Sequence, residues 1–153
     1  MKILVVPRIF HLYPHEKDFY VDNYFISIGE RENYEGVPIQ FNGDNILRLV
    51  FDDVTDEYPS STKKFTKEDA AKIKEFADKM DTSKFLYVNC FAGISRSGAV
   101  GDALNIYLNR YLDQNDDYRW FFDNNLGIQP NPLVHRLLMI ELGLSYERVE
   151  DNG

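Results

Sequence analysis

The sequence predicts an α/β domain in which a central, largely parallel β-sheet is flanked by helices. Short apolar segments of strand length alternate along the chain with longer segments whose apolar residues recur at helical spacing. Strands that alternate with helices in this way form layered domains with a mostly parallel sheet. A chain of 153 residues that is 44% hydrophobic has enough apolar material for one core. Residues 1–148 are therefore predicted to form a single domain, and residues 149–153 a frayed tail.

The predicted strands are apolar runs of five or six residues bounded by polar or turn-forming residues. In chain order they are residues 2–6, 24–29, 46–51 and 85–89. A weaker strand is predicted at residues 38–41.

The first long helix is predicted to begin at Thr66, because an acidic side chain three residues later, Asp69, completes a capping pattern. The next follows residue 96 and is apolar around much of its circumference, which predicts a central position. Two more are predicted at residues 116–123 and 132–142, the latter with Pro132 in its first turn. The buried stripes of the first two helices are Ile73, Phe76, Ala77, Met80 and Val100, Ala103, Leu104, Tyr107, Leu108, Tyr111.

The segment from Cys90 to Gly98 contains the residues with the clearest chemical function. It joins the last predicted strand to the central helix and places a thiol at Cys90 and a guanidinium at Arg96. A strand that ends in a tight loop before a helix N-terminus presents converging backbone N–H groups to an anion. The same field stabilises a thiolate. The segment therefore predicts displacement at a bound phosphoryl group.

This segment resembles the signature loop of the cysteine-dependent protein tyrosine phosphatases, Cys-x5-Arg-Ser/Thr, and is most similar to the dual-specificity branch. The resemblance rests on Cys90 and on the run from Ala92 to Ser97. It implies a phosphatase-like fold and a cysteinyl-phosphate intermediate, with Cys90 as nucleophile and Arg96 as phosphate clamp. The residues expected to surround the phosphate are Phe91, Ala92, Gly93, Ile94, Ser95 and Arg96.

Three smaller residues have predicted roles in the loop. Gly93 suits a backbone that curls around an anion with positive φ, and Gly98 permits close packing where the helix begins. Ser97 is expected to hydrogen-bond the cysteine sulfur and to ease departure of the thiolate. Helix capping is an equally compatible role for Ser97.

A general acid is expected on a separate loop upstream of the nucleophile. The predicted strand at residues 46–51 runs into an acidic segment, and in the dual-specificity family the acid is an aspartate just past such a strand. Asp53 is the first candidate, Asp52 the second and Asp56 the third. Alternation along the strand would point Asp52 away from Asp53.

The sequence departs from the family at Asn89, where a histidine usually precedes the nucleophile. In the family, the ring of that histidine donates hydrogen bonds that order the loop. An asparagine amide can also donate hydrogen bonds, but it carries no titratable charge. We therefore expect a higher thiol pKa and slower turnover than in a histidine-containing relative. Downstream, residues 129–132 resemble the Pro-Asn segment before the last helix of dual-specificity phosphatases. The resemblance covers residues 46–144, and residues 7–44 match no segment of the family.

Composition limits the partners. The net charge of −8 disfavours general binding to nucleic acids or anionic membranes, and no apolar run approaches the length of a membrane span. Residues 91–95 contain no lysine, which favours singly phosphorylated substrates, either a phosphorylated protein or a small phosphomonoester. The single cysteine must stay reduced, so the expected location is cytoplasmic. The sequence does not decide the oligomeric state.

No metal or other cofactor is expected, because His11, His15 and His135 show no ligand spacing with one another or with Cys90. The sequence predicts a phosphomonoester hydrolase of the protein tyrosine or dual-specificity type. The alternative is a weak or inactive phospho-ligand binding module with the same fold, suggested by Asn89 and the acidic composition. An RNA 5′-triphosphatase is a third hypothesis, weakened by the lack of a basic track.

Overall fold

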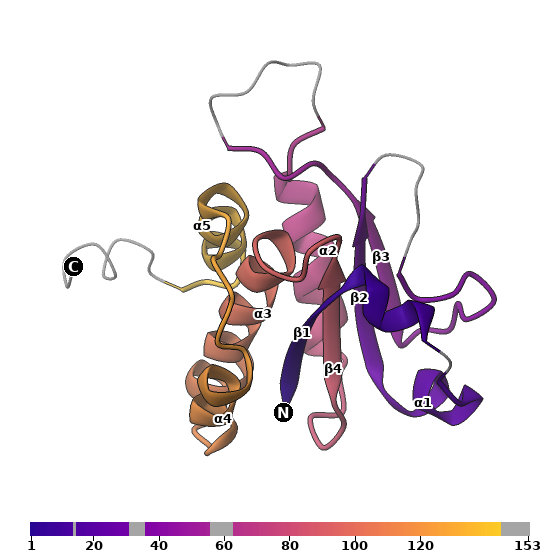
Figure 1. Ribbon diagram of the computed structural model, residues 1–153. Coiled ribbons are helices and arrows are strands. Elements are labelled where there is room, and N and C mark those ends of the chain that lie inside the picture. Colours follow the sequence, from indigo (N-terminus) through magenta and orange to yellow (C-terminus); the bar gives the residue numbers. More distant parts are fainter. Residues whose placement is uncertain (14, 31–35, 56–62, 145–153) are drawn as a thin grey trace.

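A four-stranded, wholly parallel sheet forms the centre of the molecule, in the order β1-β4-β2-β3 (Figure 1). The computed structural model describes residues 1–13, 15–30, 36–55 and 63–144, so Asp56 and the predicted tail lie outside the described residues. The α/β fold class and the four main predicted strands are confirmed, each to within one residue at either end. The strands are β1 (Ile3–Pro7), β2 (Tyr24–Gly29), β3 (Ile46–Val50) and β4 (Leu86–Cys90).

The weaker strand predicted at residues 38–41 is wrong. This segment is a turn in which the backbone N–H of Phe41 donates to the carbonyl of Pro38 at 3.0 Å. The guanidinium of Arg48 on β3 donates to the carbonyls of Val37, Pro38 and Phe41 at 2.7–3.0 Å. Those carbonyls converge on one side chain, so they do not form a strand ladder.

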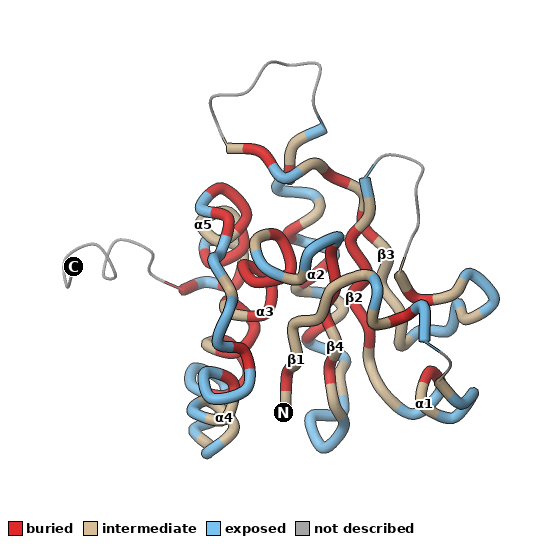
Figure 2. The backbone as a smooth tube through the Cα atoms, in the orientation of Figure 1, coloured by how far each residue is buried: buried red, intermediate tan, exposed pale blue. Residues whose placement is uncertain are grey.

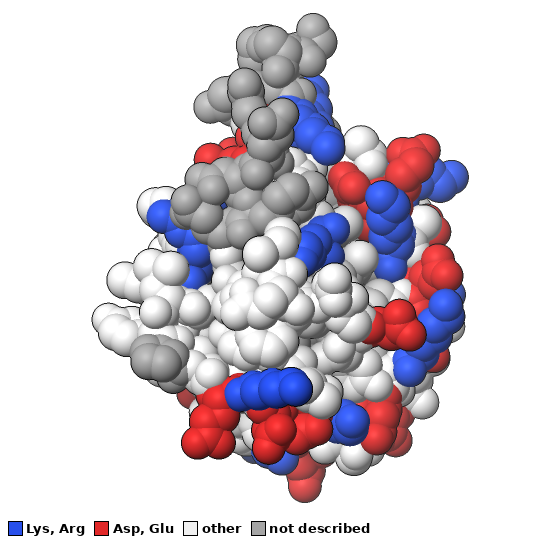
Figure 3. Space-filling model, turned by 90° about the vertical axis from the view of Figure 1, so that its right-hand side faces the viewer, with Lys and Arg blue, Asp and Glu red and all other residues white. Residues whose placement is uncertain are grey.

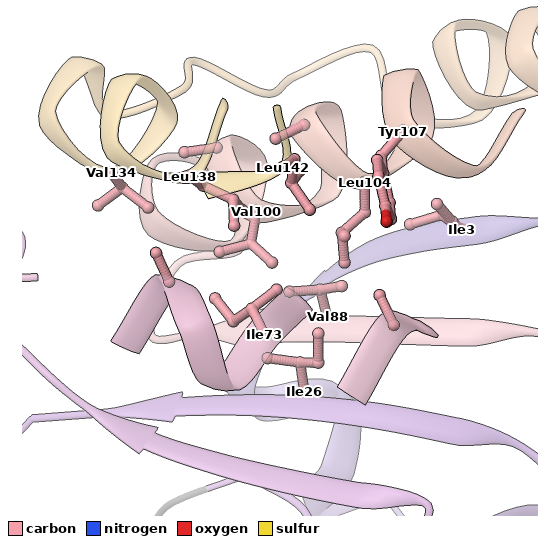
Figure 4. Packing of buried hydrophobic residues seen from close by; sticks show 14 of the residues in the cluster. Ile3, Ile26, Ile73, Val88, Val100, Leu104, Tyr107, Val134, Leu138 and Leu142 are labelled. Carbon is pink, nitrogen blue, oxygen red and sulfur yellow. The ribbon is translucent and has the colours of Figure 1, made fainter. Parts of the chain in front are cut away.

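Two helices, α2 (Lys67–Asp78) and α3 (Arg96–Ile106), cover one face of the sheet, and a third, α5 (Pro132–Glu141), packs against both of them (Figure 1). Their apolar side chains meet those of the strands in the main core, where Ile26 and Val88 lie opposite Ile73 and Val100 (Figure 4). The predicted capping box is present at the start of α2. The Thr66 hydroxyl accepts from the Asp69 backbone N–H at 3.1 Å, and the Asp69 carboxylate accepts from the Thr66 N–H at 3.0 Å.

The central helix departs from its predicted stripe at its end. After Ile106 the chain continues as a π-helical segment, η2 (Tyr107–Tyr111), and the Leu112 N–H donates to the Tyr107 carbonyl at 2.8 Å. The extra residue in the π turn rotates the following side chains out of phase. Tyr107 and Leu108 are buried, but Tyr111 is 60% exposed, so its predicted place in the buried stripe is wrong. A further helix, α4 (Asp117–Asn124), follows and packs beside β1.

The opposite face of the sheet is covered by elements that the sequence did not predict, the 3-10 helix η1 (Arg8–Leu12) and the short helix α1 (Lys17–Asp22). Tyr20, Phe25 and Val37 form a second, aromatic-rich core there. The sheet consequently lies between the two cores. The burial of its strands can be followed in Figure 2. In the described part of the chain, no helix combines the length and apolarity needed to cross a membrane.

Candidate active site

The Cys-x5-Arg segment forms a tight loop at the carboxyl end of the central strand. Cys90 is the last residue of β4, Arg96 is the first residue of α3, and residues 91–95 connect them. The loop lies at the upper end of the sheet in Figure 1, where all four parallel strands end. Ligands bind at this edge in open α/β sheets. The nucleophile candidate Cys90 is only 2% exposed.

Glycine is required at the centre of the loop. Gly93 has a φ of 69°, and a Cβ atom there would lie 2.5 Å from backbone atoms of Val6 and Pro7. Both the conformation and the contact exclude a side chain. At Gly98 a Cβ would lie 3.1 Å from the Cβ of Ile128, which is the close packing predicted at the start of the helix.

The environment of Cys90 favours the thiolate. Burial opposes ionisation, but hydrogen bonds from the Ser97 hydroxyl and from backbone N–H groups outweigh it, and the thiol pKa lies below its ordinary 9.0. The Ser97 Oγ atom is 3.1 Å from the sulfur, and the N–H groups belong to Gly93, Ile94 and Ser97. The lowered pKa stabilises the fold above the ordinary value, and this stabilisation is lost as the pH falls through the folded-state pKa.

Arg96 is buried within the site, with 3% of its surface exposed. Its two terminal nitrogens donate to the Phe51 carbonyl at 3.0 Å and to the Glu30 carboxylate at 2.9 Å. Its Nε atom has no hydrogen-bond partner. Sequence reasoning missed Glu30. Its position directly after β2, at the carboxyl edge of the sheet, was the available signal.

The structure separates the candidate acids. Asp53 is exposed beside the Cys-x5-Arg loop, where its Oδ1 accepts from the Ser95 hydroxyl at 2.9 Å and from the Asn131 amide at 2.8 Å. Asp52 instead accepts from the backbone N–H of Lys63 at 2.9 Å. The geometry thus brings Asp53 to the loop and directs Asp52 to another segment.

Asn131 connects three parts of the site. Its side-chain oxygen caps α5 by accepting from the backbone N–H groups of Leu133 and Val134 at 2.9 and 3.2 Å. Its amide donates to Asp53, and its backbone N–H donates to the Ser95 carbonyl at 3.0 Å. The sequence resemblance marks this Pro-Asn segment but does not predict its contacts with Asp53 and Ser95.

Asn131→Ala is expected to reduce both stability and turnover. Loss of the α5 cap should cost about 1 kcal/mol of unfolding free energy and lower the Tm by roughly 4 °C. If Asp53 is the general acid of a phosphatase, its release should lower kcat for an alkyl phosphate about tenfold. Thermal unfolding and steady-state kinetics measure the two effects. Thr66→Ala, which removes the cap of α2, is the control and should lower the Tm without changing kcat. Equal kinetic effects in both variants would contradict the role given to Asn131.

The histidines are engaged elsewhere in the fold. His135 Nε2 lies 2.7 Å from the Asp102 carboxylate, and His11 Nδ1 lies 2.9 Å from the Tyr20 hydroxyl. Across residues 1–13, 15–30, 36–55 and 63–144, no group of three His, Cys, Asp or Glu side chains is arranged to hold a metal ion.

Comparison with known proteins identifies the fold. No family profile and no curated protein sequence matches this chain. Solved structures do match. Human DUSP28 has a TM-score of 0.53 and 14% identity, over 99% of this chain and 95% of its own. PTPMT1, solved in complex with PI(5)P, has a TM-score of 0.51 and 17% identity, over 99% and 95%.

A third match is the human tyrosine phosphatase-like serine/threonine/tyrosine-interacting protein. Its TM-score is 0.52 and its identity 22%, over 84% of this chain and 78% of its own. These overlaps extend beyond residues 46–144, the part for which the sequence showed a resemblance. The resemblance read from the signature loop is therefore confirmed at the level of the fold: this chain has the fold of the cysteine-dependent protein tyrosine phosphatases, of the dual-specificity type.

Proposed function

We propose that this protein is a cysteine-dependent phosphomonoester hydrolase that acts on phosphotyrosine and on phosphoserine or phosphothreonine. The observation that carries the proposal is the environment of Cys90. Its thiol has a lowered pKa and lies in a loop whose N–H groups point at the sulfur, close to the start of α3. Such a thiolate is nucleophilic toward an anion that the same groups bind.

The proposed reaction has two steps. The Cys90 thiolate attacks phosphorus in line, a sulfur–phosphorus bond forms, and the phosphorus–oxygen bond to the leaving group breaks. Asp53 donates its proton to the departing oxygen. Asp53, now a carboxylate, takes a proton from water, whose oxygen attacks phosphorus and releases inorganic phosphate and the thiolate. Ser97, 3.1 Å from the sulfur, stabilises the thiolate as it leaves.

Arg96 is the proposed clamp for the phosphoryl oxygens. A buried guanidinium needs a counter-charge, and Glu30 supplies one. The Nε atom, which has no partner, is a remaining donor for a phosphoryl oxygen. Charge that develops on the equatorial oxygens in the transition state would strengthen this contact.

The surroundings of the loop support a singly phosphorylated substrate. Phe91 and Ile94 are 57% and 40% exposed on the loop itself, and the guanidinium of Arg8 lies 4.4 Å from the Phe91 ring centroid. The face over η1 and α1 is uncharged in its middle, with acidic and basic groups around it (Figure 3). We propose a phosphorylated protein segment or a small aryl phosphate as substrate, in a reducing compartment such as the cytoplasm.

The alternative is a phospho-ligand binding module with the same fold. It is favoured by the engagement of Arg96 by Glu30 and by Asn89 in place of the usual histidine. One protein of similar structure is itself named as phosphatase-like and interacting. A thiol retained with a lowered pKa favours the enzyme instead.

Hydrolysis of p-nitrophenyl phosphate across pH, with vanadate as inhibitor, tests the proposal. An enzyme should show vanadate-sensitive turnover whose acid limb follows the titration of the thiol. Absence of turnover, combined with vanadate or phosphate binding measured by calorimetry, would establish the binding module. Absence of both would refute the loop as a phosphate site.

A further inference from the structure

The Cys-x5-Arg loop exposes apolar side chains next to the nucleophile. Phe91 directly follows Cys90, and Ile94 lies three residues further along the loop. Both side chains are exposed, and both lie outside the two cores that the described residues form. Apolar side chains that stabilise the fold are usually buried, so these two contribute little to it. Exposed apolar surface beside a binding site is typical of a surface that contacts a ligand.

The helix η1 continues this apolar surface. The last residue of β1 pairs in register with Cys90, and the next residue, Arg8, donates its backbone N–H to the Phe91 carbonyl at 3.2 Å. The helix η1 therefore begins directly beside the nucleophile. Ile9 and Leu12 are three residues apart, so they share one face of a 3-10 helix, and they are 52% and 70% exposed.

Phe91 is held in place by the same helix. The Arg8 guanidinium lies 4.4 Å from the Phe91 ring centroid, which is the geometry of a cation–π contact. With the hydrogen bond to the Phe91 carbonyl, Arg8 contacts both the ring and the main chain of this residue. A side chain that is already ordered loses little conformational entropy when a ligand packs against it.

The other end of the loop is charged. The Ser95 hydroxyl donates to the exposed Asp53 carboxylate, and Arg96 donates to Glu30, whose side chain is 56% exposed. These carboxylates, with the net charge of −8, oppose docking on an anionic membrane. A peptide can place unlike side chains at the two ends of the loop. The charge distribution therefore favours a peptide as the occupant of the apolar end.

We propose that the exposed apolar side chains of the loop and of η1 form one rim, which binds the ring of a phosphotyrosine and a large apolar residue next to it in the substrate. This apolar rim consists of Phe91, Ile94, Ile9 and Leu12. A phosphoryl group held by the loop fixes the point from which the substrate chain leaves the site, and the apolar rim borders that point. Aromatic rings pack well on the ring of Phe91, and removing apolar surface from water favours an apolar neighbour on η1. The effect on turnover rests on the proposed function, but the effect on binding needs only a loop that holds phosphate.

Two phosphotyrosine peptides test this proposal. They differ only in the two residues that flank the phosphotyrosine, which are leucine in one peptide and serine in the other. Hydrolysis gives kcat/KM for each peptide, and calorimetry on proteins that also carry Cys90→Ser gives each Kd without turnover. The variants are Ile9→Ser with Leu12→Ser, Phe91→Ser, Phe91→Leu, and Ile140→Ser as control. Ile140 is 59% exposed at the far end of α5 from the loop.

The wild-type protein should prefer the leucine peptide about tenfold, in kcat/KM and in Kd. The double variant of η1 should reduce this preference to about twofold or less. Its two side chains are more than half exposed, so the fold should tolerate the change. Phe91→Ser should weaken binding of both peptides, and Phe91→Leu should restore part of it. Ile140→Ser should keep the wild-type preference.

Several results would overturn the proposal. They are equal affinities of the wild-type protein for the two peptides, a full preference in the η1 double variant, and an equal loss in Ile140→Ser. Binding through η1 to vesicles of phosphatidylcholine and phosphatidylserine, or a dimer that the η1 double variant abolishes, would also overturn it. A protein that hydrolyses neither peptide but binds the leucine peptide more tightly would refute the hydrolase and leave the apolar rim intact.

Discussion

Cys90→Ser should abolish turnover, with a loss of about 10⁴-fold or more in kcat for an aryl phosphate. The reason is ionisation. The N–H groups and the Ser97 hydroxyl bring the thiol pKa below 9.0, but they act on a serine hydroxyl whose pKa is far higher. A neutral hydroxyl at position 90 has no comparable nucleophilicity.

The variant should still bind oxyanions, because the backbone N–H groups and Arg96 remain. Steady-state kinetics with p-nitrophenyl phosphate and calorimetry with phosphate measure the two properties on one preparation. His15→Asn provides a matched change outside the loop and should retain wild-type turnover. A Cys90→Ser protein with undiminished activity would end the proposed mechanism, and one that loses phosphate binding would point to a collapsed loop.

Asp53→Asn should lower kcat by about 10²–10³-fold for substrates with poor leaving groups, because the proton for the departing oxygen is gone. The loss should be much smaller for p-nitrophenyl phosphate, since its leaving group is stable as an anion. The substitution keeps size and shape, and an amide at position 53 can still accept from Ser95 and Asn131.

Asp52→Asn is the comparison for this experiment. Asp52 is the sequence neighbour of Asp53, but its carboxylate accepts from the Lys63 backbone N–H. This variant therefore tests whether either aspartate of the pair can act as the general acid. We expect little change in leaving-group dependence for Asp52→Asn. A larger loss of kcat in Asp52→Asn than in Asp53→Asn, for substrates with poor leaving groups, would transfer the acid role to Asp52.

The pattern of residue types along short stretches of sequence was enough to predict the strand before the Cys-x5-Arg loop and the helix after it. The apolar run before Cys90 and the helical spacing after Arg96 predicted β4 and α3, and the side chains of Thr66 and Asp69 predicted the start of α2. These features involve residues close in sequence, where propensity and capping decide the structure. The π turn at Tyr107–Tyr111 escaped prediction, because a one-residue change of phase leaves little trace in an apolar segment.

The segment before β3 shows why other parts could not be predicted. Pro38–Phe41 has the composition of a short strand, but Arg48 binds its carbonyls and holds it as a turn. Likewise η1 has too few residues for a helical period. Its Phe10 ring stacks on Tyr87 of β4, and its His11 ring contacts Phe25 of β2. Tertiary contacts override local propensity in such short segments.

The sequence by itself determined the fold class, the strand–loop–helix segment with Cys90 and Arg96, and Asp53 as the first candidate for the acid. Only the tertiary structure decided which side chains contact them: Glu30 binds Arg96, and Asn131 binds Asp53. The physical reason is distance along the chain. Backbone conformation and helix capping are set by near neighbours, whereas these contacts join residues 66–78 positions apart and exist only once parallel strands bring their carboxyl ends together.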